Sequence, residues 1–279
     1  MWTKEQTKLE MAADLVRSAM TCLGPQRRVI LCCDSWYPKG CVKQLVEEYT
    51  NLTIICNVRS DTALYALPPK PTGKRGRPRS RGERLTVESI VQTEIPESGF
   101  SVGFQPVKTN LFGSRTVYAI STKSKEGKRY RLFLCTENPQ NLPFDLAFSD
   151  ESAARFAKAD SNFTPLTIYA LRWNIEIAFY EQKTFWALGD YRLRSQTGIE
   201  RLLNLLTLCY ASTKILPFLS HDFHFLKGLS PQQARFALSK AINREIFFPS
   251  FIARLETANI SPNLISSLKS LFFSFSSAA

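Results

Sequence analysis

Two short apolar runs separated by one helical segment constrain the fold of this chain more than any other feature. Residues 28–34, RVILCCD, and residues 52–58, LTIICNV, are almost uninterrupted in apolar side chains. This pattern is typical of strands that are covered on both faces. Residues 40–50 between them suit a helix. Such a strand–helix–strand unit is most simply a parallel pair with a right-handed crossover, so the sequence predicts an α/β core.

The flanking segments extend this plan. Residues 4–20 repeat apolar side chains at helical spacing and stop before Gly24 and Pro25, which predicts a helix. After residue 84 the chain becomes β-rich, with strand candidates at LTVESIV, TVYAIS and YRLFLC. From residue 150 onward the pattern turns helical, and helices are expected at 165–188, 197–216, 231–241 and 251–272.

The order of these elements predicts five segments along the chain. They are a partial core, a basic loop, a β-rich insertion, a set of core helices and a C-terminal helical region, with boundaries at 1–66, 67–84, 85–145, 146–220 and 221–279. No apolar run is expected to be long enough to span a bilayer, so the sequence predicts no membrane partner. Seven cysteines without a CxxC pair favour reduced thiols in a cytoplasmic protein.

The charge of the chain indicates a polyanionic partner. The net charge is +12, and nucleic acid is the usual partner of so basic a protein. Seven cations within residues 67–84 stand against the single Glu83, so this loop carries half of that net charge. Its centre, with Arg75, Arg77 and Arg79, resembles an AT-hook that enters a narrow minor groove. The alternative is a solvated linker whose arginines touch phosphates without reading sequence.

Four polar residues stand out in the helix expected over 165–188. At about 100° per residue, Tyr169, Arg172, Glu176 and Lys183 fall inside a sector roughly 60° wide. The helix is otherwise apolar enough to be buried, and a second polar stripe, made of Asn174, Glu181 and Gln182, is expected to face solvent. A structural Arg172–Glu176 pair and a functional site both explain the first stripe, and spacing alone does not separate them.

The pattern Y-x-x-R-x-x-x-E-x-x-x-x-x-x-K resembles the signature of bacterial DDE transposases of the insertion-sequence-four type. The stretches LRWNIEIAFYEQK and RLRSQTGIERL around it resemble the C-terminal region of that family. The resemblance implies a ribonuclease-H-like fold in which two Asp and one Glu hold two divalent ions, Mg²⁺ or Mn²⁺. Glu176 would be the third carboxylate. Tyr169, Arg172, Lys183 and Arg194 would contact double-stranded DNA at transposon ends, and the enzyme would act as a homodimer.

By the same resemblance, Asp34 is the second Asp of the family and a metal ligand. It ends the strand VILCC, where the crevice of such sheets lies. Asp also favours turns, so a strand-terminal turn residue is the alternative. The first Asp of the family has no counterpart, because Asp14 is the only Asp before Asp34 and lies within a helix. The resemblance thus implies a core without its first strands, an open apolar edge on VILCC, and an isolated chain that does not cut DNA.

Three functions compete at this point. The first is a transposase, present here as a fragment, that cuts and joins transposon-end DNA in a bacterial cytoplasm, close to the nucleoid. The second is a non-catalytic DNA-binding remnant that keeps the scaffold and the basic loop. The third is a different α/β enzyme, such as a phosphatase with Asp34 as nucleophile, and it leaves the helical stripe unexplained.

Overall fold

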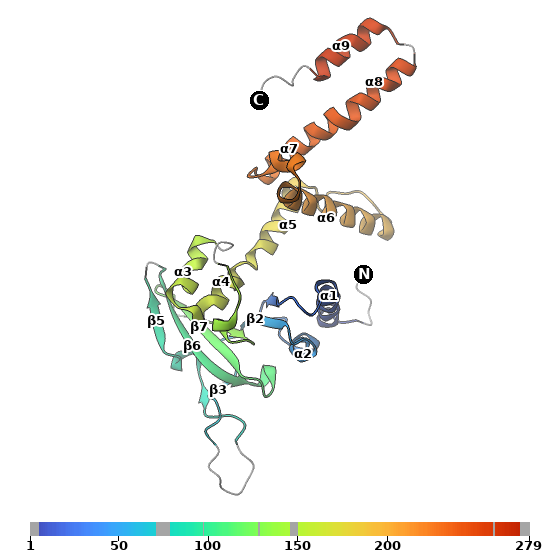
Figure 1. The fold of residues 1–279 in the computed structure, drawn as a ribbon. Helices are drawn as coiled ribbons and strands as arrows, with labels where there is room; N and C mark the ends of the chain where they lie inside the picture. The colour runs from blue at the N-terminus through green and yellow to red at the C-terminus, as the bar shows by residue number, and fades with distance from the viewer. Residues whose placement is uncertain are drawn as a thin grey trace. The chain divides into compact units, whose positions relative to one another are not determined.

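The structure, a computed structural model, describes residues 6–70, 79–96, 98–127, 129–145, 150–258 and 260–273. The chain divides into two compact units, Met1–Asn174 and Ile175–Ala279. The first unit holds a sheet flanked by helices, and the second is helical (Figure 1). The predicted α/β class with a helical C-terminal part is therefore confirmed, whereas the five-segment division stays a prediction.

One sheet of eight strands forms the centre of the first unit. Its order is β1-β2-β8-β7-β6-β3-β4, and β5 pairs with β6. The strands are β1 Val29–Cys33, β2 Leu52–Val58, β3 Leu64–Tyr65, β4 Arg84–Leu85, β5 Gln92–Ile95, β6 Phe100–Thr109, β7 Val117–Ser124 and β8 Tyr130–Cys135. Only β1 and β2 are parallel, and the other pairs are antiparallel. The β-rich region thus extends the same sheet as the two apolar runs.

Alternation along the strands supplies two apolar faces. Ile54 and Leu134 lie in a core cluster on one face, together with Val46 of the helix α2 (Gly40–Glu48). Ile55 and Phe133 lie in the cluster on the other face, which includes Leu166 from the helix α4 (Thr164–Ala170). Successive strand side chains point to opposite faces, so central strands that are covered on both sides need the continuous apolar runs seen in the sequence.

The strand β1 is an edge of the sheet. It pairs with β2 in parallel, from Val29 opposite Leu52 to Cys33 opposite Cys56. No other strand of the described residues pairs with β1. The expected parallel unit and its open apolar edge are both present, and such an edge is a template for pairing with another chain.

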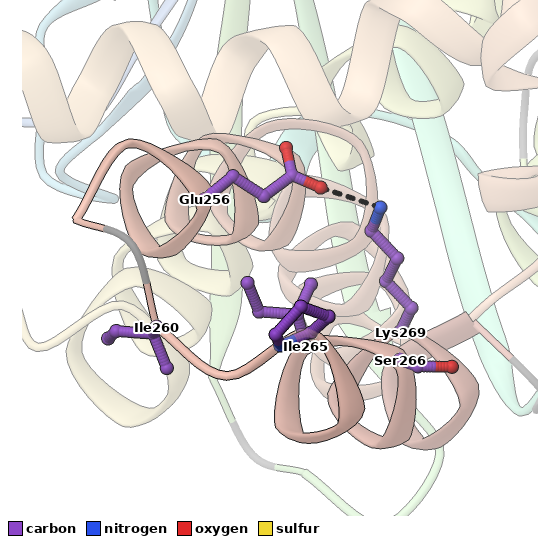
Figure 2. A pocket seen from close by; sticks show the side chains of 6 residues that line it. Glu256, Ile260, Ile265, Ser266 and Lys269 are labelled. Carbon is purple, nitrogen blue, oxygen red and sulfur yellow. Dashed lines mark hydrogen bonds and ion pairs between the residues drawn. The ribbon is translucent and has the colours of Figure 1, made fainter.

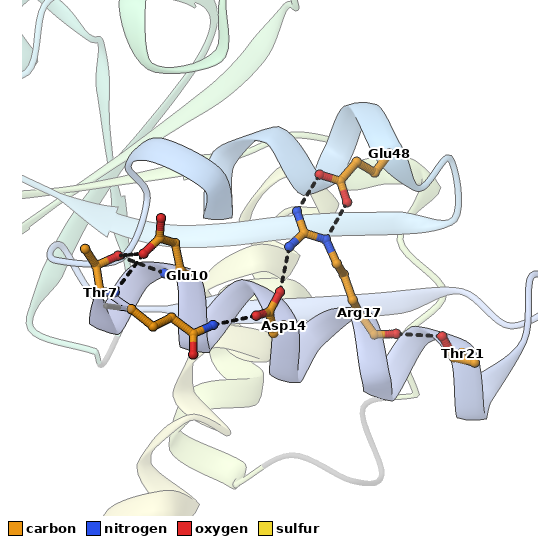
Figure 3. Close-up of polar contacts among 7 residues, drawn as sticks. Thr7, Glu10, Asp14, Arg17, Thr21 and Glu48 are labelled. Atoms are coloured by element: carbon orange, nitrogen blue, oxygen red, sulfur yellow. Dashed lines mark hydrogen bonds and ion pairs between the residues drawn. The ribbon is translucent and has the colours of Figure 1, made fainter. Parts of the chain in front are cut away.

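The helix α1 (Lys8–Leu23) packs against α2 through apolar and ionic contacts. Thr7 caps α1 and forms a capping box with Glu10. Arg17 binds Glu48 of α2 through two hydrogen bonds of 2.9 and 2.8 Å and also binds Asp14 at 2.9 Å (Figure 3). Beneath these exposed pairs lies a cluster that includes Ala13 and Leu45. Because exposed ion pairs contribute little, the apolar cluster carries most of this contact.

The second unit is built from helices in sequence. Their bounds are α5 Trp173–Phe185, which begins at the unit boundary, α6 Gln196–Leu219, α7 Pro231–Ile242, α8 Phe248–Thr257 and α9 Pro262–Phe273. The helix expected over 251–272 is two helices, because the chain turns between Thr257 and Pro262. An open pocket of about 610 Å³ lies at α8 and α9, and Lys269 and Glu256, 2.8 Å apart, form an ion pair on its wall (Figure 2).

Two further expectations are wrong. LTVESIV is not a strand, since Val87–Ser89 forms a 3₁₀ turn after the short β4. A membrane-spanning length was not expected anywhere, yet α6 has 24 residues and a mean hydropathy of 1.4 in its most apolar stretch. By length and composition alone, α6 is long and apolar enough to cross a membrane. Glu200, Arg201 and Lys214 interrupt this apolar run in the sequence and hide its length.

Candidate functional site

Asp34 lies where β1 ends, as the sequence predicts. Its side chain is exposed and accepts a hydrogen bond of 2.9 Å from the Trp36 backbone N–H. The Tyr37 N–H donates to the Asp34 carbonyl at 3.3 Å. This contact is an Asx-type turn, so the turn role proposed for Asp34 is present. It occupies one acceptor position of a carboxylate that has several, which leaves the metal-ligand role a prediction.

Tyr169 lies within electrostatic reach of Asp34, and Arg172 packs on Tyr169, although both are more than 130 residues from Asp34 in the chain. The Tyr169 ring stacks edge-on against Phe133 of β8, with 5.0 Å between ring centroids. The Arg172 guanidinium carbon lies 5.6 Å from the centre of the Tyr169 ring. Burial raises the pKa of Tyr169, the Arg172 charge and hydrogen bond oppose this rise, and the nearby Asp34 carboxylate adds to it. The structure therefore places Arg172 in contact with Tyr169 and Tyr169 within electrostatic reach of Asp34.

Arg172 also lies close to the thiol of Cys32 on β1. Burial raises the pKa of Cys32 to about 12, and the Arg172 charge acts against that shift. The thiol is therefore protonated at neutral pH and is not a nucleophile. Around this end of β1, the groups suited to bind a phosphate are the guanidinium of Arg172 and the hydroxyl of Tyr169.

The helix that was expected to run unbroken over 165–188 is interrupted at Leu171. The helix α4 ends at Ala170, and α5 begins at Trp173. Between them the N–H groups of Leu171, Arg172 and Asn174 donate to carbonyls three residues back, at 3.0 Å each. Bonds of this spacing tighten the turn to 3₁₀ geometry. The single four-residue stripe is therefore wrong, because Tyr169 and Arg172 do not share a helix with Glu176 and Lys183.

Glu176 and Lys183 both lie on α5 and are both exposed. Seven residues are close to two full helical turns, so these two side chains share one face of α5. The prediction that α5 is buried is wrong, since Ile175, Ile177 and Phe179 are exposed as well. The predicted solvated stripe is wrong in one member, Glu181.

Glu181 is the residue of α5 that the sequence reasoning missed. It is only 8% exposed. Its carboxylate accepts a hydrogen bond of 2.7 Å from the Tyr210 hydroxyl and forms an ion pair of 2.7 Å with Lys214. Both partners come from α6, four residues apart, and so lie on one face of that helix. That i, i+4 pair is the sequence signal that could have marked α6 as the partner of a carboxylate.

We expect Glu181→Ala to lower the free energy of unfolding of the second unit by about 2 kcal/mol. The substitution leaves the Tyr210 hydroxyl without its acceptor and Lys214 without its partner. The half-exposed Lys214 keeps the loss below that of a fully buried pair. Urea unfolding followed by hydrogen exchange at α6 amides measures the change. Glu256→Ala, which removes the exposed partner of Lys269, is the control, and an equal loss in both variants would contradict the role of burial.

Two of the remaining predicted DNA contacts lie in exposed connections between described elements. Arg79 is exposed at the end of the basic loop, and Arg194 is exposed between α5 and α6. Arg75 and Arg77 lie outside the described residues. The choice between an AT-hook and a plain linker for this loop therefore stays open.

Comparison with known proteins reaches the part of the chain that holds Asp34. Residues 3–99 match the family of DDE superfamily endonucleases. The match covers β1, α2 and β2, and ends before the Tyr169–Lys183 pattern. It makes this part of the chain similar to DDE superfamily endonucleases, while the insertion-sequence-four transposase type stays a prediction.

Other comparisons add less. The structure is similar to the piggyBac transposase in its synaptic complex with hairpin DNA, with a TM-score of 0.45 and 14% identity over 96% of this chain. This chain spans 46% of the length of that transposase chain. No curated protein matches the sequence.

DDE superfamily nucleases generally use divalent metal ions. The described residues do not gather three His, Cys, Asp or Glu side chains into a group that could hold a metal. Asp34 belongs to the first unit and Glu176 to the second. Two hard divalent ions need several oxygen ligands. The described residues of the chain thus gather no complete two-metal centre.

Proposed function

We propose that this chain is a transposase-like protein of the DDE type that binds double-stranded DNA and does not cut it alone. The observation that carries the proposal is the contact of Arg172 with Tyr169, whose hydroxyl interacts electrostatically with Asp34, inside the unit that contains the whole DDE match. The net charge of +12 supports a DNA partner. Transposon ends as the specific target, and a homodimer as the active form, are part of the proposal.

In this function Arg172 and Tyr169 hold a backbone phosphate next to Asp34. The guanidinium has five N–H donors in a planar fork that matches two phosphate oxygens. The Tyr169 hydroxyl adds one donor, and its raised pKa keeps that donor protonated at neutral pH. Lys183 adds a point charge on α5. Asp34 and Glu176 would supply carboxylates, and at least one further carboxylate is needed to complete the centre.

We expect Arg172→Gln to weaken duplex binding about tenfold, because a charge-assisted hydrogen bond to phosphate contributes about 1.5–3 kcal/mol. Fluorescence anisotropy of a labelled duplex measures the affinity. Arg59→Gln is the matched control, since Arg59 is exposed and is paired with Asp61 at 2.8 Å. An equal loss in both variants would show a diffuse charge effect and remove Arg172 from the site.

Cutting is tested on the same purified chain. Incubation with supercoiled DNA and Mg²⁺ is expected to give no nicking above a protein-free control. Efficient nicking by the monomer would overturn the claim that the chain needs another carboxylate.

A non-catalytic DNA-binding protein is the second candidate, and the Asx-type turn of Asp34 favours it. The two functions differ in how Mg²⁺ affects DNA affinity. If Asp34 is a metal ligand, Mg²⁺ changes the affinity of the wild-type chain and this response is lost in Asp34→Ala. If Asp34 is only a turn residue, the Mg²⁺ response is the same in both proteins. Affinity at matched ionic strength is the measurement.

A further inference from the structure

A cavity lined by polar side chains lies in the first unit, between the segment that precedes β4, the end of β6 and the turn that follows β6. Its volume is about 350 Å³, and it shares no residue with the surroundings of Asp34. The lining residues are Ser80, Arg81, Lys108, Thr109, Asn110, Gly113 and Ser114. None of these described residues carries a carboxylate, whereas two of them are cations. The cavity therefore favours an anion.

Strand register gathers the positive charge around one tyrosine. Tyr65 lies opposite Arg84 on β4 and opposite Lys108 on β6. Residues that lie directly opposite across paired strands point to the same face of the sheet. The guanidinium carbon of Arg81 lies 4.5 Å from the centre of the Tyr65 ring. Arg81 thus lies over the ring, and Arg84 and Lys108 share its face of the sheet.

Arg81 is held in place before any ligand arrives. Its Nη1 donates a hydrogen bond of 2.6 Å to the Asn110 side chain. The backbone beside it is fixed, since the Gly82 N–H donates to the Ala66 carbonyl at 2.8 Å. A side chain at Gly82 would lie 2.7 Å from the Leu67 carbonyl oxygen, so only glycine permits this approach. One of the five donors of Arg81 is used by Asn110, and a fixed guanidinium loses little entropy on binding.

Lys108 is also held within the cavity wall. It donates a hydrogen bond to the Ser114 carbonyl, which follows Gly113 in a turn with φ of 60° at the glycine. The exposed residues Ser80 and Ser114 add hydroxyl groups. Arginine, lysine and hydroxyl donors in one concave site are the groups that bind phosphate oxygens.

We propose that this cavity binds a phosphate group of the DNA backbone, at the base of the basic loop. The inference rests on the proposed function, because DNA is the ligand that supplies the phosphate. It differs from the AT-hook and linker hypotheses for residues 67–84, because Arg81 and Lys108 are held in place by contacts with the folded unit. Contacts of this kind set the register of a protein on DNA and carry no sequence information.

The test compares two double variants that remove the same charge. Arg81→Gln/Lys108→Gln removes the cations of the cavity. Arg59→Gln/Arg129→Gln removes two exposed arginines elsewhere in the unit. Duplex affinity is measured over a range of salt concentrations. We expect the cavity variant to bind about tenfold more weakly and to lower the salt slope by about one, the contribution of a single phosphate contact. At the single site, Lys108→Arg keeps the charge. It is therefore expected to lose less duplex affinity than Lys108→Gln.

A second arm uses inorganic phosphate, titrated at constant ionic strength and followed by the amide chemical shifts of Gly113 and Ser114. If the wild type binds DNA and the two double variants behave alike, the cavity proposal is wrong and the proposed function stands. If the wild type does not bind DNA but phosphate moves these amides, the proposed function fails and the cavity is a site for free phosphate. If neither binds, both proposals are wrong. Circular dichroism confirms that each variant is folded.

Discussion

Raising the salt concentration from about 50 mM to about 200 mM is expected to weaken duplex binding by about three orders of magnitude. Each phosphate that a lysine or arginine neutralises releases condensed counterions, and roughly six such contacts produce a loss of this size. The chain carries enough positive charge for six phosphate contacts, since its net charge is +12 and the basic loop holds half of that value. Anisotropy titrations over four salt concentrations measure the slope.

The control for this prediction is a change of the anion in the salt. Replacing chloride by glutamate at the same concentration weakens competition for the cationic sites and is expected to tighten binding at every point. A salt slope below about two would mean that only one or two phosphates are contacted. The proposed DNA-binding function would then lose its main support, because the positive charge would not be facing DNA.

Shortening a buried leucine side chain of the central strand β8 is expected to destabilise the first unit strongly. Leu134 is fully buried and belongs to the core cluster that contains Ile54 and Val46. Leu134→Ala removes apolar contacts and leaves a cavity, at a cost of about 3 kcal/mol. That is more than a hundredfold in the folding equilibrium. Native-state hydrogen exchange at the amides of β7 and β8 measures the loss in this unit separately from the helical one.

Leu15→Ala is the matched control for this core substitution. Leu15 lies on α1 and is 71% exposed, so its truncation is expected to change stability by less than about 0.5 kcal/mol. Similar losses in both variants would contradict the burial of β8. Similar losses would also contradict the pairing of β8 with β2 in one continuous sheet.

Local pattern in the sequence was sufficient for the strands that are buried on both faces. The runs at 28–34 and 52–58 predict β1 and β2 because apolar side chains dominate them. The strand β6 was missed, since Gly103, Gln105 and Pro106 interrupt its alternation. Its place in the sheet is set by pairing with β7 over eight residues. Such pairing is a tertiary property that no local window contains.

The candidate site was predicted in part for a similar reason. The resemblance to the insertion-sequence-four signature singled out Asp34, Tyr169 and Arg172 as candidates, and spacing alone did not separate a functional role from a structural one. The 3₁₀ turn at Leu171 has no breaker residue in LRWN, so an unbroken helix was the natural expectation. Glu181 was placed on a solvated stripe because its partners, Tyr210 and Lys214, belong to another helix. Burial of a charge depends on partners that are distant in sequence.

The pairing of β2 with β8 has a consequence for synthesis of the chain. Ile55 lies opposite Cys135 in this pair, and the Ile54 N–H bonds the Thr136 side chain, 82 residues further along. A ribosome adds roughly 5–20 residues per second, so β2 waits roughly 4–16 s for this neighbour to be made. During that interval one edge of LTIICNV has no partner. We therefore expect nascent chains that end before residue 130 to depend on chaperones for solubility, and completed chains to be released from them.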